Sequence, residues 1–398
     1  MRPKKSSTHD PEVVAIYFPS WHPDSHYAKW YGKGFSEWEL LKTTQSLFTG
    51  HGQPKMPLWG YFDESKPEWM EKQIDLAVNH GLTGFIFDWY WYGGEKFLHK
   101  ALEDGFLKSR NKGRLKFSLM WANHDWGVWP AKSDVPGMAN MVNQGDTLLL
   151  KMTHSPEDLG RAIAYCCLHY FKHDHYWRIG GEPVFSFFDL DCLTRQLGGA
   201  EKAARAIELM RKTVRRHGFD GLYLLGNIGC CNDNAYCCGW GRVGSAKSLG
   251  FNSVFAYNIV RSPSYKTLPD EMPVYDYSEV MASHALCWDR IEAGGLTHFP
   301  SVTTGLDVSP RWDRQTKFPM DFKKLGYEPI VINNTPEKFG QLLSRALGRV
   351  KPGRFGERAV IINAWNEWTE GMYLLPEERH GTAYLEALRQ AVTSTSGT

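Results

Sequence analysis

The sequence predicts an α/β fold, a single (β/α)8 barrel of the TIM type with long loops after its strands. Three observations predict it: the chain has 398 residues, short apolar runs recur along it, and amphipathic segments separate these runs. Strands that alternate with helices are typical of a parallel sheet, and eight such units can close into a barrel. Because no repeat or linker divides the chain, we expect one barrel over residues 13–392, a disordered segment at 1–12 and a frayed tail at 393–398.

Apolar runs give the predicted strands, and amphipathic segments give the predicted helices. The strands, in chain order, are Val13–Phe18, Gly84–Trp89, Leu115–Trp121, Pro183–Phe187, Leu222–Gly226, Ser253–Tyr257, Phe299–Thr303 and Ala359–Ile362. The helices are Pro67–Asn79, Glu95–Phe106, Pro156–Phe171, Ala200–His217, Val280–Ala293, Pro336–Val350 and Thr382–Val392. The clearest helix is Ala200–His217, which ends in basic residues followed by Gly218, as the helix dipole and C-cap rules expect.

The composition excludes several classes of partner. Hydrophobic residues make up 42% of the chain and charged residues 23%, as in a globular protein with an ample core. The net charge of +2 leaves no strong basic field for nucleic acid or an anionic membrane. No apolar segment long enough for a signal peptide or a membrane span follows the basic start at Met1–Ser7. We therefore expect a cytoplasmic protein without a nucleic-acid or membrane partner, and the sequence does not indicate its oligomeric state.

The eight cysteines include three adjacent pairs, and two of these lie close together, at Cys230-Cys231 and Cys237-Cys238. A zinc site is one interpretation of the two close pairs. Their spacing is not C-x₂-C, however, and no histidine follows at zinc-finger spacing. Without a secretion signal we expect reduced, buried thiols, and we predict neither a metal nor a cofactor.

The ends of the predicted strands carry the candidate binding residues. Aromatic residues make up 14% of the chain, which suits either an aromatic core or a sugar-binding cleft. In a parallel barrel, functional groups lie just past the carboxyl ends of the strands, and polar or aromatic side chains cluster there in this sequence. The candidate substrate-binding residues are Trp21, His22, Glu37, Asp88, Trp91, Asn123, Asp125, Trp126, Asn227, Tyr257, Trp365 and Asn366, and Asp307 is a weaker candidate.

Several of these candidates also have a structural explanation. Asp88 could cap the loop after its strand, and Glu37 could anchor the long first loop. A lone histidine such as His22 or His51 is more often a structural hydrogen-bond donor than a ligand. Trp89 and Trp91 alternate along their strand, so we expect one to face the barrel and the other to face the cleft.

Two carboxylates three residues apart, Glu367 and Glu370, follow the last predicted strand and are the candidate catalytic residues. Paired carboxylates beside aromatic faces suit sugar chemistry, because one manages a proton while the other supports a cationic transition state. On a strand the two would face opposite sides, whereas a helical turn after Trp365 would place them on one face, about 5–6 Å apart at Cβ. The alternative explanation is that both acids only stabilise the start of the last helix.

The stretch Trp365–Gly371 resembles the N-E-W-x-E-G signature of glycoside hydrolase family 99, the endo-α-mannosidases, and more of the chain resembles the related WbsX-like proteins. The matching segments are Tyr17–Pro23, Trp30–Trp38, Leu47–Pro54, Gly84–Phe87 with Tyr90-Trp91, and Trp121–Asn123, so the resemblance spans residues 13 to about 376. Relatives usually carry an acid directly after Trp-Ala-Asn, whereas this chain has His124 and then Asp125. The cysteine-rich stretch 229–241 matches no family pattern. Both departures bear on the identity of the substrate.

The resemblance implies hydrolysis of α-linked, mannose-like sugars in an oligosaccharide or polysaccharide, with retention of configuration. Carried over by motif, Glu367 takes the proton from the sugar 2-hydroxyl, which attacks the anomeric carbon to give a 1,2-anhydro sugar. Glu370 protonates the leaving oxygen and then activates water, so we expect burial or the charge of Glu367 to raise the pKa of Glu370. The ordinary retaining route, in which one carboxylate is the nucleophile, stays open.

Two other functions stay open. A glycosyltransferase of O-antigen-type polysaccharide biosynthesis, the label that some relatives carry, would need a nucleotide-sugar site. Asp189-Leu190-Asp191 is formally a D-x-D motif, but such tripeptides are common by chance, and no glycine-rich phosphate loop leads into a helix. The third possibility is a carbohydrate-binding protein without catalytic activity.

Overall fold

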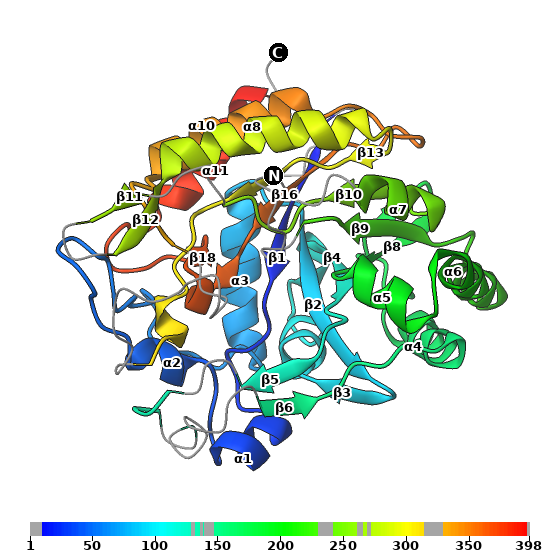
Figure 1. The fold of residues 1–398 in the computed structure, drawn as a ribbon, viewed down its shortest axis with the longest axis horizontal. Helices are drawn as coiled ribbons and strands as arrows, with labels where there is room; N and C mark the ends of the chain where they lie inside the picture. The colour runs from blue at the N-terminus through cyan, green and yellow to red at the C-terminus, as the bar shows by residue number, and fades with distance from the viewer. Residues whose placement is uncertain are drawn as a thin grey trace.

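The computed structural model describes residues 10–128, 132–135, 138, 147–229, 242–260, 266–268, 272–313 and 329–395. All eight predicted strands are present in it as parallel members of one curled sheet, which confirms the TIM-type α/β fold (Figure 1). The strands are β1 (Glu12–Tyr17), β2 (Gly84–Tyr92), β4 (Lys116–Trp121), β8 (Glu182–Phe187), β9 (Tyr223–Asn227), β10 (Ser253–Phe255), β13 (Thr297–His298) with β14 (Ser301–Thr303), and β16 (Ala359–Asn363).

The seventh predicted strand joins the two ends of the sheet. Its first half, β13, pairs with β10 and its second half, β14, pairs with β16, so the order runs β13-β10-β9-β8-β4-β2-β1-β16-β14. The link between the halves is also hydrogen-bonded, because Phe299 N donates to Val254 O (2.9 Å) and Ile361 N donates to Pro300 O (3.0 Å). One segment therefore borders both edge strands and brings the carboxyl ends of the strands to one rim.

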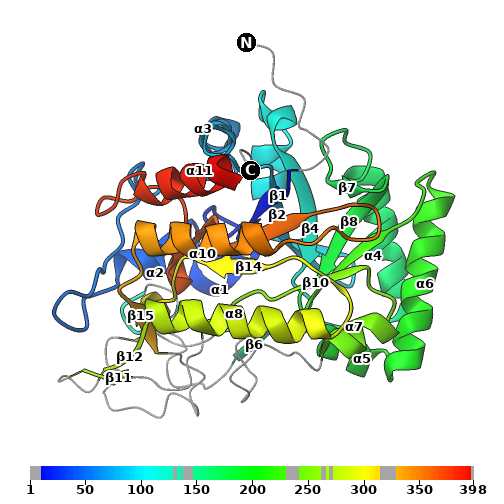
Figure 2. The same cartoon turned by 90° about the horizontal axis from the view of Figure 1, so that it is seen from above.

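Helices cover the outer face of the sheet. In both views α4 packs beside α6 (Figures 1 and 2), and Figure 2 shows that α10 lies between α8 and α11. The buried residues of α10 are Phe339, Leu342, Leu343, Ala346 and Leu347, whose spacing of three and four gives one apolar stripe. The outer helices are α3 (Pro67–Asn79), α4 (Pro156–His169), α6 (Ala200–Arg216), α8 (Tyr277–Ala293), α10 (Pro336–Arg349) and α11 (Ala383–Thr395).

The helix predicted over Glu95–Phe106 is wrong in its first half. Strand β2 continues to Tyr92, and β3 (Glu95–Phe97) returns antiparallel to it, pairing Phe97 with Tyr90. The turn between them is Gly93-Gly94, whose φ angles of 62° and 112° favour glycine. Only the second half is helical, as the π-helical turn η1 (Ala101–Phe106).

Shorter elements fill the loops, and most of them lie at the rim, as the prediction of long βα loops requires. The elements near the candidate site are α1 (Ser25–Tyr31), α2 (Trp38–Lys42), β5 (Trp126–Val128), β6 (Thr147–Leu150), η4 (Ser309–Arg311), β17 (Asn366–Glu367), η5 (Trp368–Glu370) and β18 (Met372–Tyr373). The others are η2 (Lys112–Arg114), β7 (Arg178–Ile179), α5 (Leu190–Gln196), α7 (Arg242–Ser248), β11 (Lys266–Thr267), β12 (Pro273–Asp276) and β15 (Ile330–Ile332).

The predicted buried thiols are confirmed for the part of the chain that the structure covers. Cys166, Cys167, Cys192 and Cys287 are free and buried. Cys230, Cys231, Cys237 and Cys238 lie outside the described residues, as do residues 1–9 and 396–398 of the two terminal segments that the sequence predicts to be disordered or frayed. None of the helices that the structure describes is both long and apolar enough to cross a membrane.

Candidate active site

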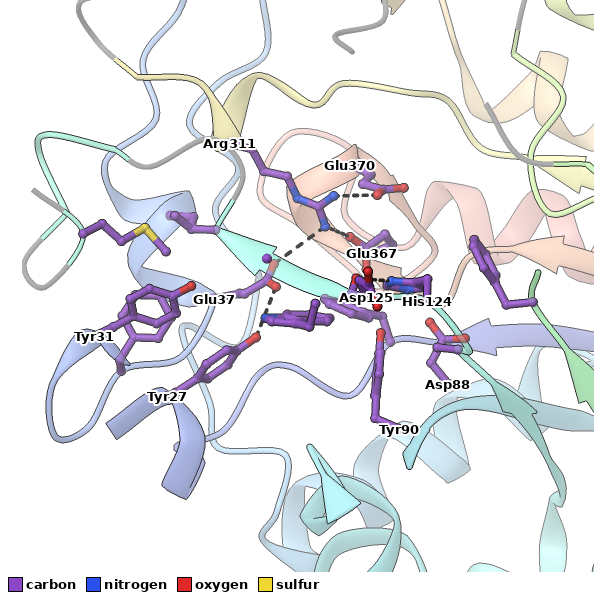
Figure 3. Close-up of a pocket in the computed structure, with 18 of the residues that line it drawn as sticks. Tyr27, Tyr31, Glu37, Asp88, Tyr90, His124, Asp125, Arg311, Glu367 and Glu370 are labelled. Atoms are coloured by element: carbon purple, nitrogen blue, oxygen red, sulfur yellow. Dashed lines mark hydrogen bonds and ion pairs between the residues drawn. The ribbon is translucent and has the colours of Figure 1, made fainter. Parts of the chain in front are cut away.

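A cavity of about 300 Å³ opens among the loops at the carboxyl ends of the strands (Figure 3). Residues at or beyond the ends of β1, β2, β4, β8, β10, β14 and β16 line it. This is the position at which barrel enzymes carry their functional groups. We call it the acidic pocket after the charged side chains that line it, which are Glu37, Asp88, Asp125, Arg311, Glu367 and Glu370.

The two glutamates of the signature reach this pocket through a tight turn. The chain leaves β16, forms the short strand β17, and then turns through the 3-10 segment η5 to Gly371, whose φ is 68°. Of the two arrangements that the sequence left open, the structure has a strand pair at Asn366–Glu367 followed by a 3-10 turn, and both Glu367 and Glu370 line the cavity. A backbone with positive φ favours glycine, which explains the residue at the end of the signature.

The other residues of the signature anchor the turn. The Asn366 side chain accepts from Phe18 N (2.8 Å) and donates to Phe18 O (2.8 Å), which ties the turn to the end of β1. Trp365 is fully buried, and its Nε1 donates to Gln73 Oε1 of α3 (2.8 Å). Neither Trp365 nor Asn366 lines the acidic pocket. Both side chains therefore support the turn and do not contact the cavity.

Arg311, which the sequence analysis missed, joins the two glutamates. Its Nη1 lies 2.6 Å from Glu370 Oε1, its Nη2 lies 2.8 Å from Glu367 Oε1, and Glu37 Oε2 is 3.9 Å from Nη2. Because both nitrogens belong to one guanidinium group, the carboxylates converge within the width of that group (Figure 3). Arg311 comes from η4, in the loop after β14, and a polar residue in the loop after the seventh strand is the signal that could have found it.

Burial and mutual repulsion control the protonation of the acids. Burial most strongly raises the pKa of Glu367, and the charge of Glu370 adds to it, while Arg311 opposes both effects. Burial likewise raises the pKa of Glu37, against Arg311 and a hydrogen bond from the Thr369 hydroxyl (2.7 Å). The expectation from sequence was a raised pKa at Glu370, whereas the fully buried carboxyl of the pair is that of Glu367.

Asp88 is a buried acid without a hydrogen-bond partner for one oxygen. The residue is 8% exposed, its Oδ1 makes no hydrogen bond within the described protein, and its side chain lines the pocket. Burial raises its pKa well above the usual range, and the charge of Glu370 adds to this effect. Asp88 therefore does not cap its loop, and its buried carboxyl group borders the pocket with one oxygen unsatisfied.

The position at which the sequence departs from the expected family pattern lies in the same pocket. His124 Nδ1 donates to the carbonyl oxygen of Asp125 (2.8 Å), and burial lowers the pKa of the imidazole. A neutral ring with a hydrogen on Nδ1 leaves Nε2 as an acceptor. Asp125 also lines the cavity, while its Oδ1 accepts from Met152 N (2.7 Å) and holds the following ribbon of β5 and β6 in place.

One end of the acidic pocket is aromatic. Tyr27 and Tyr31 of α1 lie at the end away from Asp88 (Figure 3). The Trp126 ring approaches Tyr90 at 5.3 Å and Tyr27 at 6.4 Å between centroids, and all of these residues line the pocket. Tyr257, one of the predicted substrate-binding residues, also lines the pocket, and its ring centroid lies 5.1 Å from that of Phe188. Rings beside acids and hydroxyl groups offer both a stacking face and polar partners.

The other predicted binding residues support the site from outside it. His22 is fully buried and pairs with Glu64 Oε1 at 3.0 Å, and Trp21 packs on Trp38 with centroids 4.3 Å apart. Asn123 and Asn227 brace loops: Asn123 exchanges two hydrogen bonds with the backbone of Asp189 (2.7 and 2.8 Å). Asn227 accepts from Tyr257 N (2.8 Å). None of these side chains lines the acidic pocket.

The expectation that Trp89 and Trp91 face opposite sides is wrong. Residues two apart on a strand share a face, and the two indoles stack at 5.4 Å with an interplanar angle of 21°. Trp91 Nε1 donates to Asp158 Oδ1 of α4 (3.2 Å), so the pair packs against the outer helices. The alternate residues Asp88 and Tyr90 face the pocket.

The D-x-D tripeptide is a helix cap. Asp189 is the N-cap of α5, and its Oδ1 accepts from the backbone N–H groups of Asp191 (2.9 Å) and Cys192 (2.8 Å). Asp191 pairs with Arg242 (2.7 Å). Asp189 and Asp191 lie outside the acidic pocket, and the described residues contain no cluster of three or more His, Cys, Asp or Glu side chains arranged to hold a metal ion.

Sequence comparisons match most of the chain to a known family. A family model described as Glycosyltransferase WbsX matches residues 13–388. Two curated relatives, both described as uncharacterized protein WxcX, come from Xanthomonas campestris pv. campestris strains B100 and ATCC 33913. They are 29% identical over 392 and 389 residues, and each match covers 96% of this chain and 49% of the relative. The chain thus spans about half the length of the curated relatives it matches.

Structure comparisons find the same fold at low sequence identity. The GH99 endo-alpha-mannosidase from Bacteroides thetaiotaomicron, in complex with Bis-Tris-propane, gives a TM-score of 0.59 with 13% identity and 98% of each chain covered. A structure described as a glycoside hydrolase-like protein gives a TM-score of 0.62 with 14% identity, covering 96% of this chain and 94% of that one. At such identities the likeness shows the fold alone.

Proposed function

The chain belongs to the family described as Glycosyltransferase WbsX, and from that premise we propose that it is a glycoside hydrolase acting on α-linked, mannose-like sugars in a glycan or polysaccharide. The observation that carries the proposal is the pair of carboxylates joined by Arg311 inside a cavity at the rim of the barrel. Two carboxylates beside one anomeric centre supply both the proton transfer and the support for positive charge that glycoside cleavage requires.

In the proposed mechanism Glu367 is the base and Glu370 is the acid. Glu367 removes the proton from the sugar 2-hydroxyl, whose oxygen attacks the anomeric carbon, while Glu370 protonates the departing oxygen and then activates water. A base must be ionised, and Arg311 is the group that opposes the strong rise in the pKa of Glu367 caused by burial and by the charge of Glu370. Glu370 is the more exposed of the pair, with 22% of its side chain accessible, which suits a group that meets first a leaving group and then water.

The charge of the pocket favours hydrolysis over transfer from a nucleotide sugar. Five carboxylates and one arginine are among the described residues that line it. Such a surface attracts a developing oxocarbenium ion and repels the pyrophosphate of an activated donor. The Asp189 side chain, which a D-x-D motif would use for a metal-bound donor, is occupied in capping α5. We therefore propose that the reaction needs no nucleotide sugar and no metal.

The decisive experiment is a screen of α-linked oligosaccharides with product analysis by NMR, with and without EDTA. We expect hydrolysis that releases the α-anomer first and survives EDTA. Glu370→Gln serves as the inactive control, and it should still bind the substrate. Turnover that requires a sugar nucleotide would establish the transferase that the family description names. Binding without turnover on any substrate would instead indicate a carbohydrate-binding protein.

A further inference from the structure

A second cavity, of about 360 Å³, shares a wall with the acidic pocket. Asp307 and Gly371 line the second cavity, whereas Glu370, the neighbour of Gly371, lines the acidic pocket. The wall is tight, because Asp307 N donates to Glu370 O (2.7 Å) and a Cβ added to Gly371 would lie 2.7 Å from Asp307 Cβ. The proposed hydrolysis does not use the second cavity.

Two cationic side chains converge in this second cavity. A Cβ added to Gly52 would lie 2.6 Å from Arg379 Nη1 and 3.1 Å from Lys55 Nζ, so both nitrogens border the same point above the glycine. Neither side chain forms an ion pair with a carboxylate of the described residues, and Lys55 Nζ instead lies 5.8 Å from the centroid of the Tyr373 ring. Two cations that lie close together without an ion-pair partner repel each other, and this repulsion destabilises the fold unless an anion binds to both.

The nearby acids are already committed to other groups. The Glu377 carboxylate accepts from the backbone N–H groups of Arg379 and His380, both at 2.8 Å. The Asp307 carboxylate accepts from Gln53 (2.6 Å), from His51 Nε2 (2.9 Å) and from Ser309 N (3.1 Å). Burial lowers the pKa of Lys55, and the charge of Arg379 lowers it further. The charges of Asp307 and Glu377 act in the opposite direction but do not restore the usual pKa.

We propose that this cavity, which we call the basic pocket and define by Lys55, Arg379, Gly52, His51 and Tyr373, binds an oxyanion, either a phosphate or the carboxylate of an acidic sugar. The two cations supply charge-assisted donors on one side. Stacked rings of Phe48 and His51, 4.6 Å apart, and the Tyr373 ring supply flat walls beside them. A Cβ at residue 52 would press on the ends of both cationic side chains, so glycine at this position lets them approach each other. This inference does not depend on the proposed hydrolysis.

The test is calorimetric titration of the full chain with three probes: sodium phosphate, D-glucuronate and neutral D-glucose. We expect at least one anion to bind and glucose to bind more weakly, with the affinity falling as salt is added. Lys55→Gln and Arg379→Gln should each weaken anion binding by about tenfold, as loss of a charge-assisted donor predicts. Arg205→Gln, which removes an exposed cation paired with Glu201 on α6, should leave it unchanged.

The Gly52→Ala variant distinguishes binding in a shaped pocket from general electrostatic attraction of anions to positive charge. It keeps every charge but places a methyl group between the two cations, so we expect weaker anion binding with an unchanged melting temperature. Binding of phosphate alone, or of glucuronate alone, identifies which oxyanion the site accepts. The proposal is overturned if neither anion binds better than glucose, or if Lys55→Gln and Arg379→Gln bind as Arg205→Gln does.

Discussion

The acidic pocket and the basic pocket lie on the two sides of one wall, but they differ in which groups lack a partner. In the acidic pocket these are carboxyl groups, and in the basic pocket they are cationic side chains. In the acidic pocket, one arginine faces five lining carboxylates, and Asp88 keeps an oxygen with no hydrogen bond. In the basic pocket, Lys55 and Arg379 converge while Asp307 and Glu377 serve neighbouring groups. The comparison teaches that the partners of each charge, and not the number of charges, decide which ligand a cavity favours.

The largest effect is expected from the two signature glutamates. Glu367→Gln and Glu370→Gln should each lower kcat/KM by about 10³-fold, because each removes a proton-transfer group and keeps the shape of the side chain. Steady-state kinetics on the substrate identified by the screen would measure it. Anion binding in the basic pocket should not change in either variant. A loss of less than tenfold in both variants would contradict their catalytic roles.

Arg311→Lys should lower activity by about 10²-fold, because lysine cannot bind two carboxylates through one fork. Arg311 opposes the rise in the pKa of Glu367, so a lysine that pairs with Glu370 and leaves Glu367 without a contact lets burial raise that pKa further. If Glu367 must be ionised, the acidic limb of the kcat/KM profile then moves to higher pH. A profile that keeps its position, in a variant that melts as the wild type does, would show that Arg311 does not control this ionisation.

Trp126→Ala tests the aromatic end of the acidic pocket. We expect KM to rise about tenfold with kcat nearly unchanged, since loss of a stacking face removes substrate binding that ground state and transition state share. Phe188→Leu is a matched control, because Phe188 is another aromatic residue that lines the pocket but packs on Tyr257 and not on the Tyr27 and Tyr90 rings beside Trp126. A fall in kcat with an unchanged KM would instead assign Trp126 to the positioning of the catalytic turn.

Asp307→Asn probes the wall between the two pockets. Hydrogen bonds from His51, Ser309 and Gln53 hold the pKa of Asp307 well below its usual value, despite burial. Its stabilising contribution, about 2 kcal/mol for a charged hydrogen-bonded group, is therefore present above pH 4 and lost as the pH falls through the depressed pKa. Urea unfolding at pH 7 and pH 3 should show the gap between wild type and variant narrowing at low pH. A gap independent of pH would contradict this account.

The smallest effect on activity is expected from Trp91→Phe. The variant loses one hydrogen bond to Asp158 but keeps the aromatic contact with Trp89, so stability should fall by about 1 kcal/mol. Because Trp91 packs against the outer helices, kcat/KM should change by less than about twofold. A large rise in KM would mean that the indole contacts substrate after all.

The sequence predicted the positions of the strands more securely than the roles of the side chains between them. Apolar runs such as Val13–Phe18 and Ala359–Ile362 must be buried wherever they fold, so their periodicity alone reveals them. The first half of the predicted helix at Glu95–Phe106 failed because Gly93-Gly94 permits a hairpin that the apolar pattern does not register. Among the predicted site residues, Glu37, Asp88 and Tyr257 line the acidic pocket, while Trp21, His22 and Asn123 support it from outside.

By itself, the sequence determined the barrel and the placing of Glu367 and Glu370 beyond its last strand, because local spacing encodes both. Only the tertiary structure decided which groups meet those carboxylates. Arg311 is 56 residues from Glu367, and Lys55 is far along the chain from Arg379, yet each pair converges in one cavity. Contacts of this kind depend on how the loops fold over the rim, and no short-range pattern of residues records that arrangement.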